Sequence, residues 1–296
     1  MNSKLVVLGL ATAVLYSCGD PKKETEVTTD DLPDPDTAKT AVLNVGGELF
    51  SVPSPIQTAM LIQKAGVAYE KAILNPANRM GNYSSDYHKA LNLGIYGADL
   101  GYVSMYNQTQ DAIGYLASVK QLADKLGVSA AFDQQTMERI NKNISNKDSM
   151  LVLVGIAYRA SDSYLKTNKR TEVSSLILTG GWLESMHFSI NAYAKKQSDD
   201  IKFRIADQKQ ALGSIIKLLN SHNMPEATEL GKELEELAKI YEGITSKYTF
   251  VEPTTDEAKK VTYINSTTEV TISKEQLEQI AAKVKAIREK IVNAQS

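Results

Sequence analysis

The sequence predicts an all-α fold, a bundle of about eight helices with a small β-hairpin or extended excursion before the last helix. Three observations favour this fold class. Apolar residues recur at helical spacing through most of residues 41–296. Capping residues stand where several of these stretches begin, and proline is rare within them. One stretch near the C-terminus, residues 246–272, is β-prone instead.

The first predicted helix begins at Pro55, because Ser54 supplies a capping residue and proline is favoured at the first helical position. Residues at helical spacing then extend this helix to Ile73, before Asn75 and Pro76. Further helices are predicted at residues 84–106, 110–126, 130–144, 148–167, 171–196, 199–221 and 225–243.

The last predicted helix runs from Ser273 to Asn293. Ser273 and Gln276 have the spacing of a capping box, in which each side chain bonds the backbone of the other residue. Gly127 is the expected C-cap of the 110–126 helix. These terminal signals fix where the helices begin and end.

Two apolar runs, residues 91–98 and 150–157, have almost no polar face. A helix that is apolar on every side is buried on every side, so both runs are predicted to lie at the centre of the bundle. The glycines at positions 94, 97 and 101 would let neighbouring helices approach closely.

The β-prone stretch contains two strand-like segments, Lys260–Ile264 and Glu269–Ile272, which flank the turn-forming residues 265–268. This arrangement predicts a hairpin. An isolated hairpin is only marginally stable in water, so we expect it to pack on the bundle. An extended linker is the alternative interpretation.

The charge and the motifs exclude several classes of function. The formal net charge is −2, with no basic footprint for nucleic acid. The motifs His-Glu-x-x-His, Gly-x-Ser-x-Gly, Gly-x-Gly-x-x-Gly and the P-loop are absent, and no cofactor or catalytic residue is predicted. An enzyme is therefore the less favoured interpretation.

Polar residues on apolar helices are the candidate functional residues, because burying them without a partner is costly. Asp99 and Arg159 each interrupt a helix that is predicted to be central. We expect them to pair with each other, or to form the floor of a binding cleft. Asp162, one turn after Arg159, is a further candidate for the same network.

A second group of candidates follows the pair Gly180 and Gly181, which predicts a kink or a close helix approach. It contains Trp182, the only tryptophan, and the pair Glu184 and His187. The spacing of that pair is the Glu-x-x-His element of di-iron bundles, but the second such element is missing.

No metal site is therefore predicted, although a mononuclear centre of Asp99, Glu184, His187 and His88 stays open as an alternative.

Tyrosine is abundant on the early and middle helices, and Tyr102 is one example. These residues either line a moderately polar cleft or pack at the edge of the core.

The N-terminus carries a targeting signal. Lys4 precedes an apolar stretch, residues 5–16, which has the length of a secretory signal and is too short to span a membrane. The sequence Leu-Tyr-Ser-Cys then ends at Cys18, the only cysteine. It resembles the bacterial lipobox, although Tyr16 is larger than the usual residue at its position. The resemblance implies acyl chains on Cys18, cleavage before it, and anchoring in a lipid bilayer.

Three parts of the chain follow from this reading: a lipoprotein signal peptide (residues 1–17), a disordered acidic tether (18–40) and a helical bundle domain (41–296). The signal, lipobox and tether together resemble those of uncharacterised lipoproteins of Bacteroidota. The resemblance implies a lipid-anchored protein of the cell envelope, in the outer membrane, on its periplasmic or its surface face.

Two functions are compatible with this predicted location in the cell envelope. The first is a non-catalytic role in binding an envelope protein or polymer, which predicts an exposed apolar or aromatic patch. The second is solute binding in a cleft between the central helices, which predicts that five side chains converge there. These are Asp99, Tyr102, Arg159, Trp182 and His187. A metal-dependent or hydrolytic enzyme is the third interpretation.

Overall fold

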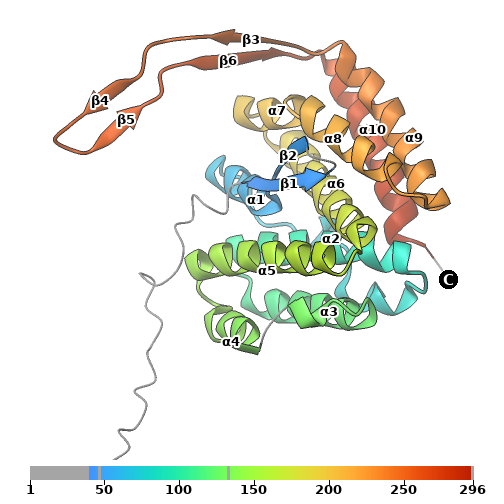
Figure 1. The fold of residues 1–296 in the computed structure, drawn as a ribbon. Helices are drawn as coiled ribbons and strands as arrows, with labels where there is room; N and C mark the ends of the chain where they lie inside the picture. The colour runs from blue at the N-terminus through green and yellow to red at the C-terminus, as the bar shows by residue number, and fades with distance from the viewer. Residues whose placement is uncertain (1–39, 46–47, 132–133, 295–296) are drawn as a thin grey trace, which may run out of the picture. The chain divides into compact units, whose positions relative to one another are not determined.

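The computed structural model describes residues 40–45, 48–131 and 134–294, all within one compact unit (Figure 1). The all-α expectation is confirmed: this part of the chain folds into ten α-helices, with small antiparallel strand pairs. The predicted signal peptide, Cys18 and almost all of the predicted tether lie outside the described residues.

The helices agree with most of the predicted ranges. They are α1 Pro55–Lys64, α2 Asp86–Met105, α3 Thr109–Lys125, α4 Gln134–Asn143, α5 Lys147–Thr167, α6 Thr171–Lys195, α7 Asp199–Ala206, α8 Lys209–Asn220, α9 Pro225–Glu242 and α10 Lys274–Val292. The capping box of α10 forms as predicted, and Gly127 ends α3 with a positive φ of 66°. None of the helices in the described ranges has the length and apolar character that crossing a lipid bilayer requires.

Two predicted helices are shorter than their apolar patterns suggest. The first ends at Lys64, because Gly66 adopts a left-handed φ of 77° that terminates it. The chain then continues irregularly, with two 3₁₀ turns at Lys71–Ile73 and Ala77–Asn82, until α2 begins. The predicted 199–221 helix breaks between α7 and α8, at Asp207 and Gln208.

The centre of the bundle is the crossing of α2 and α6 (Figure 1). Every residue from Ala90 to Met105 is buried. The predicted central position of α5 is only partly correct, because Ile156 and Ala157 are half-buried and Arg159 is exposed. The glycine pair in α6 provides a close helix approach, as one of the two alternatives predicted.

Two short strands, β1 (Thr40–Val45) and β2 (Glu48–Pro53), precede α1 and pair antiparallel. These strands were not predicted; Thr40 falls in the predicted tether, and the other strand residues fall in the predicted helical domain. β-branched residues on both sides of a Gly-Gly pair were the missed signal.

The β excursion between α9 and α10 is a two-stranded arm, residues 245–271 (Figure 1). Its strands are β3 (Thr245–Thr249), β4 (Thr254–Asp256), β5 (Val261–Tyr263) and β6 (Thr267–Thr271). β3 pairs with β6, and β4 pairs with β5. The predicted hairpin of residues 260–264 with 269–272 is therefore wrong, because the chain reverses at residues 257–260 rather than at 265–268.

Residues 265 and 266 instead bridge the two strand pairs. The Asn265 side chain donates to the carbonyl of Glu252 (2.9 Å), and the Ser266 hydroxyl donates to the carbonyl of Val251 (3.1 Å). The arm was also expected to pack on the bundle. Only its base does so, where half-buried Val270 and Ile272 lie beside α7.

Candidate functional site

The irregular chain between α1 and α2 positions the candidate site. We call residues 66–83 the connecting segment. Because it has little regular secondary structure, its buried carbonyls need hydrogen-bond donors from elsewhere. Side chains on the surrounding helices supply them. The donors are the hydroxyls of Tyr106 to Val67 (2.7 Å), Tyr115 to Asn75 (3.0 Å), Tyr96 to Pro76 (2.9 Å) and Ser118 to Ala77 (3.0 Å).

The abundant tyrosines thus have a structural use. Tyr96 and Tyr115 are buried, and each hydroxyl satisfies a backbone carbonyl of the connecting segment. Tyr102 packs its ring on Phe188, with centroids 4.7 Å apart, and its hydroxyl accepts the backbone N–H of Glu70 at 3.3 Å. This arrangement is the predicted packing role rather than the lining of a cleft.

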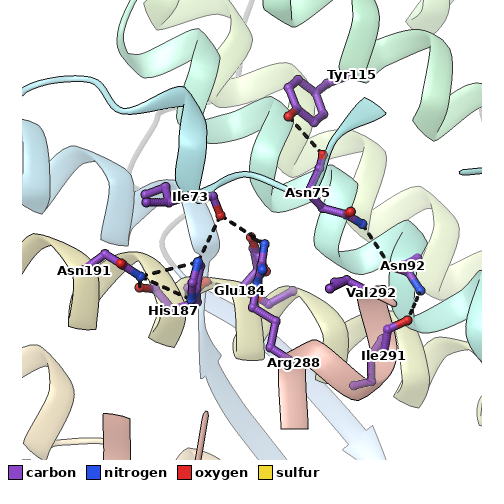
Figure 2. A network of polar contacts seen from close by, with 12 residues as sticks. Ile73, Asn75, Asn92, Tyr115, Glu184, His187, Asn191, Arg288, Ile291 and Val292 are labelled. Carbon is purple, nitrogen blue, oxygen red and sulfur yellow. Dashed lines mark hydrogen bonds and ion pairs between the residues drawn. The ribbon is translucent and has the colours of Figure 1, made fainter. Parts of the chain in front are cut away.

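At the core of the site, Arg288 of α10 forms an ion pair with Glu184 of α6 (Figure 2). Nε and Nη2 of Arg288 donate to the two carboxylate oxygens at 2.5 and 2.6 Å, a bidentate geometry. Both side chains are buried. Burial acts to lower the pKa of Arg288, but the Glu184 carboxylate outweighs it, so the pKa is raised and the guanidinium stays charged.

Ile73 connects this ion pair to the connecting segment. Its carbonyl accepts Nη2 of Arg288 at 3.1 Å and lies 3.0 Å from Nε2 of His187 (Figure 2). Because a carbonyl only accepts, we assign the imidazole proton to Nε2. Nδ1 then accepts from Asn191 at 3.2 Å. Burial lowers the pKa of His187 despite the nearby Glu184, so the neutral ring is favoured.

A second set of contacts holds the end of α10. The Asn75 amide nitrogen donates to the Tyr83 hydroxyl (3.0 Å) and to Oδ1 of Asn92 (3.1 Å). The Tyr83 hydroxyl in turn donates to the carbonyl of Val292 at 3.1 Å. The Asn92 amide donates to the carbonyl of Ile291 at 3.2 Å (Figure 2). The last carbonyls of a helix lack partners within it, and here the core side chains supply them.

Two residues of this cluster have buried polar atoms without a hydrogen-bond partner among the described residues: Asn75, at Oδ1, and Asp99. Asp99 is completely buried, and neither of its carboxylate oxygens accepts a hydrogen bond from the residues that the structure describes. Burial and the negative charge of Glu184 raise the pKa of Asp99 well above its ordinary value, while Arg288 counters this in part. The protonated, neutral carboxyl is therefore the favoured form.

The expected pair of Asp99 and Arg159 does not form. Arg159 is exposed on the outer face of α5, whereas Asp99 lies in the interior beside Glu184. Asp162 is bound elsewhere: its carboxylate accepts Lys166 at 2.6 Å and the Ser174 hydroxyl at 2.5 Å. The predicted pair is wrong because α5 is only partly central, and Arg159 lies on its exposed face.

The five side chains that were predicted to line one cleft separate into different environments. Asp99 and His187 belong to the buried cluster with Glu184, as described above. Trp182 is buried on another side of α6, where its indole N–H donates to Gln208 at 3.0 Å. Tyr102 lies in an aromatic stack, and Arg159 is exposed. The predicted cleft is therefore not formed by these residues.

The open alternative of a mononuclear metal centre finds no support in the described ranges, where no three His, Cys, Asp or Glu side chains gather as ligands. His88, one of the four candidates, lies at the start of α2 against Ser85, at 2.9 Å. Glu184 and His187 use their polar atoms on Arg288, Ile73 and Asn191.

Sequence reasoning missed Arg288, the partner of Glu184. The signal was present: Arg288 lies four residues after Val284 and eight after Ile280, on the buried stripe of α10. The criterion that selected Asp99, a charged residue on an apolar helix face, would have selected Arg288 if it had been applied to the last helix. This cluster joins α2, α6, α10 and the connecting segment in the interior through its hydrogen bonds and its ion pair.

The chain was also compared with known proteins. No family model matches it, and no curated protein and no solved structure shows significant similarity to it.

Proposed function

We propose that this protein is a lipid-anchored protein of the cell envelope with a non-catalytic interaction role, and that its partner binds along the arm. The proposed location rests on the sequence, in which the secretory signal is followed by Cys18 within a lipobox-like motif. The role rests on one observation, the exposed apolar side chains of the arm.

Exposed large apolar residues are concentrated on the arm. Phe250 is 69% and Ile264 is 74% exposed, and four further arm residues join them: Tyr248, Val251, Val261 and Tyr263. In the rest of the described chain, the large apolar residues of comparable exposure are Met60 and Ile113, one on each of two helices. Isolated exposed apolar residues are ordinary, whereas a concentration of them marks an interaction surface.

The backbone of the arm favours a protein partner over a polymer. Its strand pairs are two-stranded, so each strand has a second edge whose backbone N–H and C=O groups pair with no other strand of the described residues. An extended segment of another protein can add as a further strand and use both these groups and the apolar side chains. The reversal at residues 257–260 carries Glu257, Lys259 and Lys260, and Asp256 precedes it in β4, so the tip is charged rather than apolar.

Site-specific crosslinking tests this function. A photoreactive amino acid is placed at Ile264 of the full chain, and at Ile113 as a control that is also apolar and exposed. After irradiation of intact cells of the native host, the Ile264 position is expected to give a discrete protein adduct and the Ile113 position none. No adduct at Ile264 or at Phe250, or the same adducts from Ile113, would contradict the proposal. Adducts with a glycan polymer would replace the protein partner with that polymer.

The anchor has its own test. Cys18→Ser is expected to abolish incorporation of an alkyne-labelled palmitate and to release the protein from the membrane fraction. A variant that stays labelled and membrane-bound would disprove lipidation at Cys18, independently of the crosslinking result.

A further inference from the structure

A second feature of the bundle lies apart from both the buried polar cluster and the arm. Helices α2, α3, α4, α5 and α6 enclose a cavity of about 350 Å³. Its walls are mostly apolar, and representative side chains are Leu93, Leu116, Met137, Ile140, Val154 and Ile177. The cavity falls within the range of roughly 300–1,000 Å³ that is usual for small-molecule sites.

The polar atoms of the cavity are few, and they indicate what it would accept. Two serines line the cavity. Ser161 is buried, and its hydroxyl makes no hydrogen bond with a residue that the structure describes, whereas Ser129 is only half-buried. Lys120 and Asp124 also line the cavity but are exposed, so they mark its opening. Neither forms an ion pair with a described residue, and their opposite charges leave the opening without a net charge.

The helix α4 covers one side of this cavity. Met137 and Ile140 of α4 contribute to the lining, and Ile140 is buried. Among the helices, α4 has its main contacts with α5, at one edge of the bundle.

We propose that this cavity binds an uncharged, mostly apolar small molecule that carries one hydrogen-bonding group. The apolar walls bind its body, and the Ser161 hydroxyl bonds its polar group. A water molecule occupies about 30 Å³ in the liquid, and if a non-hydrogen atom of the ligand takes a similar volume, the cavity holds roughly twelve of them. A saturated alcohol such as 1-decanol has this size and chemistry. A carboxylate is disfavoured, because Asp124 opposes the attraction of Lys120.

Photolabelling in membranes from cells that express the full chain tests the proposal without detergent. The probe is a 1-decanol that carries a diazirine in its chain, and labelled peptides are identified by mass spectrometry. Label is expected on peptides of α3, α4 and α5. Unlabelled 1-decanol is expected to compete for this labelling, and to do so at a lower concentration than decanoate does. Label spread evenly along the chain, or stronger competition by decanoate, would overturn the proposed site or its preference for an uncharged ligand.

Matched variants locate the site. Ala157 and Ala160 are both half-buried residues of α5, but only Ala157 lines the cavity. Ala157→Phe is expected to reduce labelling at least fivefold, and Ala160→Phe to change it less than twofold. If Ala157→Phe does not fold, Val119→Phe fills the cavity from α3, and Ala117→Phe, at an exposed position of the same helix outside the lining, is its control. Equal labelling of the cavity-filling and control variants would overturn the site.

The Ser161→Ala variant tests the hydrogen bond separately. In the wild type, 1-decanol is expected to compete with the probe at a lower concentration than decane does. In the Ser161→Ala variant the two competitors are expected to act at the same concentration, while the same peptides are labelled. If 1-decanol keeps its full advantage in this variant, Ser161 does not bind the polar group.

Discussion

Gly94 of α2 and Gly180 of α6 form a reciprocal contact between the two central helices. A Cβ at Gly94 would lie 1.9 Å from the carbonyl oxygen of Ile177, and one at Gly180 would lie 1.9 Å from that of Leu91. No side chain can occupy either position, so backbone packs directly on backbone. The crossing of α2 and α6 therefore depends on glycine at both positions.

The first prediction follows from this contact. Gly180→Ala forces the helices apart and is expected to lower the free energy of unfolding by about 1–3 kcal/mol or more. Gly213→Ala in α8 is the control, because a Cβ there meets nothing within 4 Å. That variant is expected to gain up to about 1 kcal/mol from helix propensity. Urea unfolding measures both, and equal effects would disprove the close approach.

The caps and apolar periodicity predicted most of the helices, because both act within a few residues of the chain. The strand pairing of the arm was not predictable in the same way. Turn residues such as Asn265 and Ser266 can reverse a chain, but they can also bridge two strands, as they do here. Only the partner strand, β3, distinguishes these outcomes, and the residues that it pairs with in β6 lie 18 to 26 positions further along the chain.

The charged residues of the candidate site were predictable from the sequence, but their partners were not. Charged residues on apolar helices were recognisable, but their partners depend on which helix faces which. Asp99 and Arg159 lie on α2 and α5, whereas the partner of Glu184 came from α10, 104 residues away. Sequence spacing carries no information on such pairing, and the burial of each helix face decides it.

The ion pair of Glu184 and Arg288 gives the second prediction. Arg288→Leu leaves the buried Glu184 carboxylate without its partner and is expected to destabilise the protein by about 3–5 kcal/mol. Adding Glu184→Met removes that buried charge and is expected to recover much of the loss. Lys285→Leu, on the exposed side of α10, is the control and should cause no measurable change. A double variant as unstable as the single one would show that the pair is not the source of the effect.

The third prediction concerns the hydroxyl of Tyr115, which donates to the carbonyl of Asn75 in the interior. Tyr115→Phe keeps the ring but leaves this carbonyl without that donor, at an expected cost of about 1–3 kcal/mol. Tyr248→Phe makes the same change on the arm, where the side chain is 64% exposed, and should have little effect. Thermal unfolding compares the two variants. Similar stability of both would show that the connecting segment does not need the donor.

The fourth prediction is a pH dependence that comes from Asp99. Its pKa is raised in the folded protein, so the folded state keeps a proton that the unfolded chain loses above its ordinary pKa of 3.8. Unfolding then releases a proton, and the free energy of unfolding falls by about 1.4 kcal/mol per pH unit between 3.8 and the raised pKa. This contribution to stability is complete below pH 3.8 and is lost as the pH rises.

Asp99→Asn removes the titrating group while keeping the size of the side chain. The free energy of unfolding of the variant, relative to that of the wild type, is therefore expected to increase as the pH rises above 3.8 in urea unfolding experiments. Asp256→Asn on the arm is the contrasting control, because its hydrogen bond to Lys259 lowers the pKa of Asp256 and gives the opposite sign. If the free energy of unfolding has the same pH dependence in the wild type and in Asp99→Asn, the Asp99 carboxyl does not hold a proton in the folded protein. The buried cluster would then carry an additional negative charge.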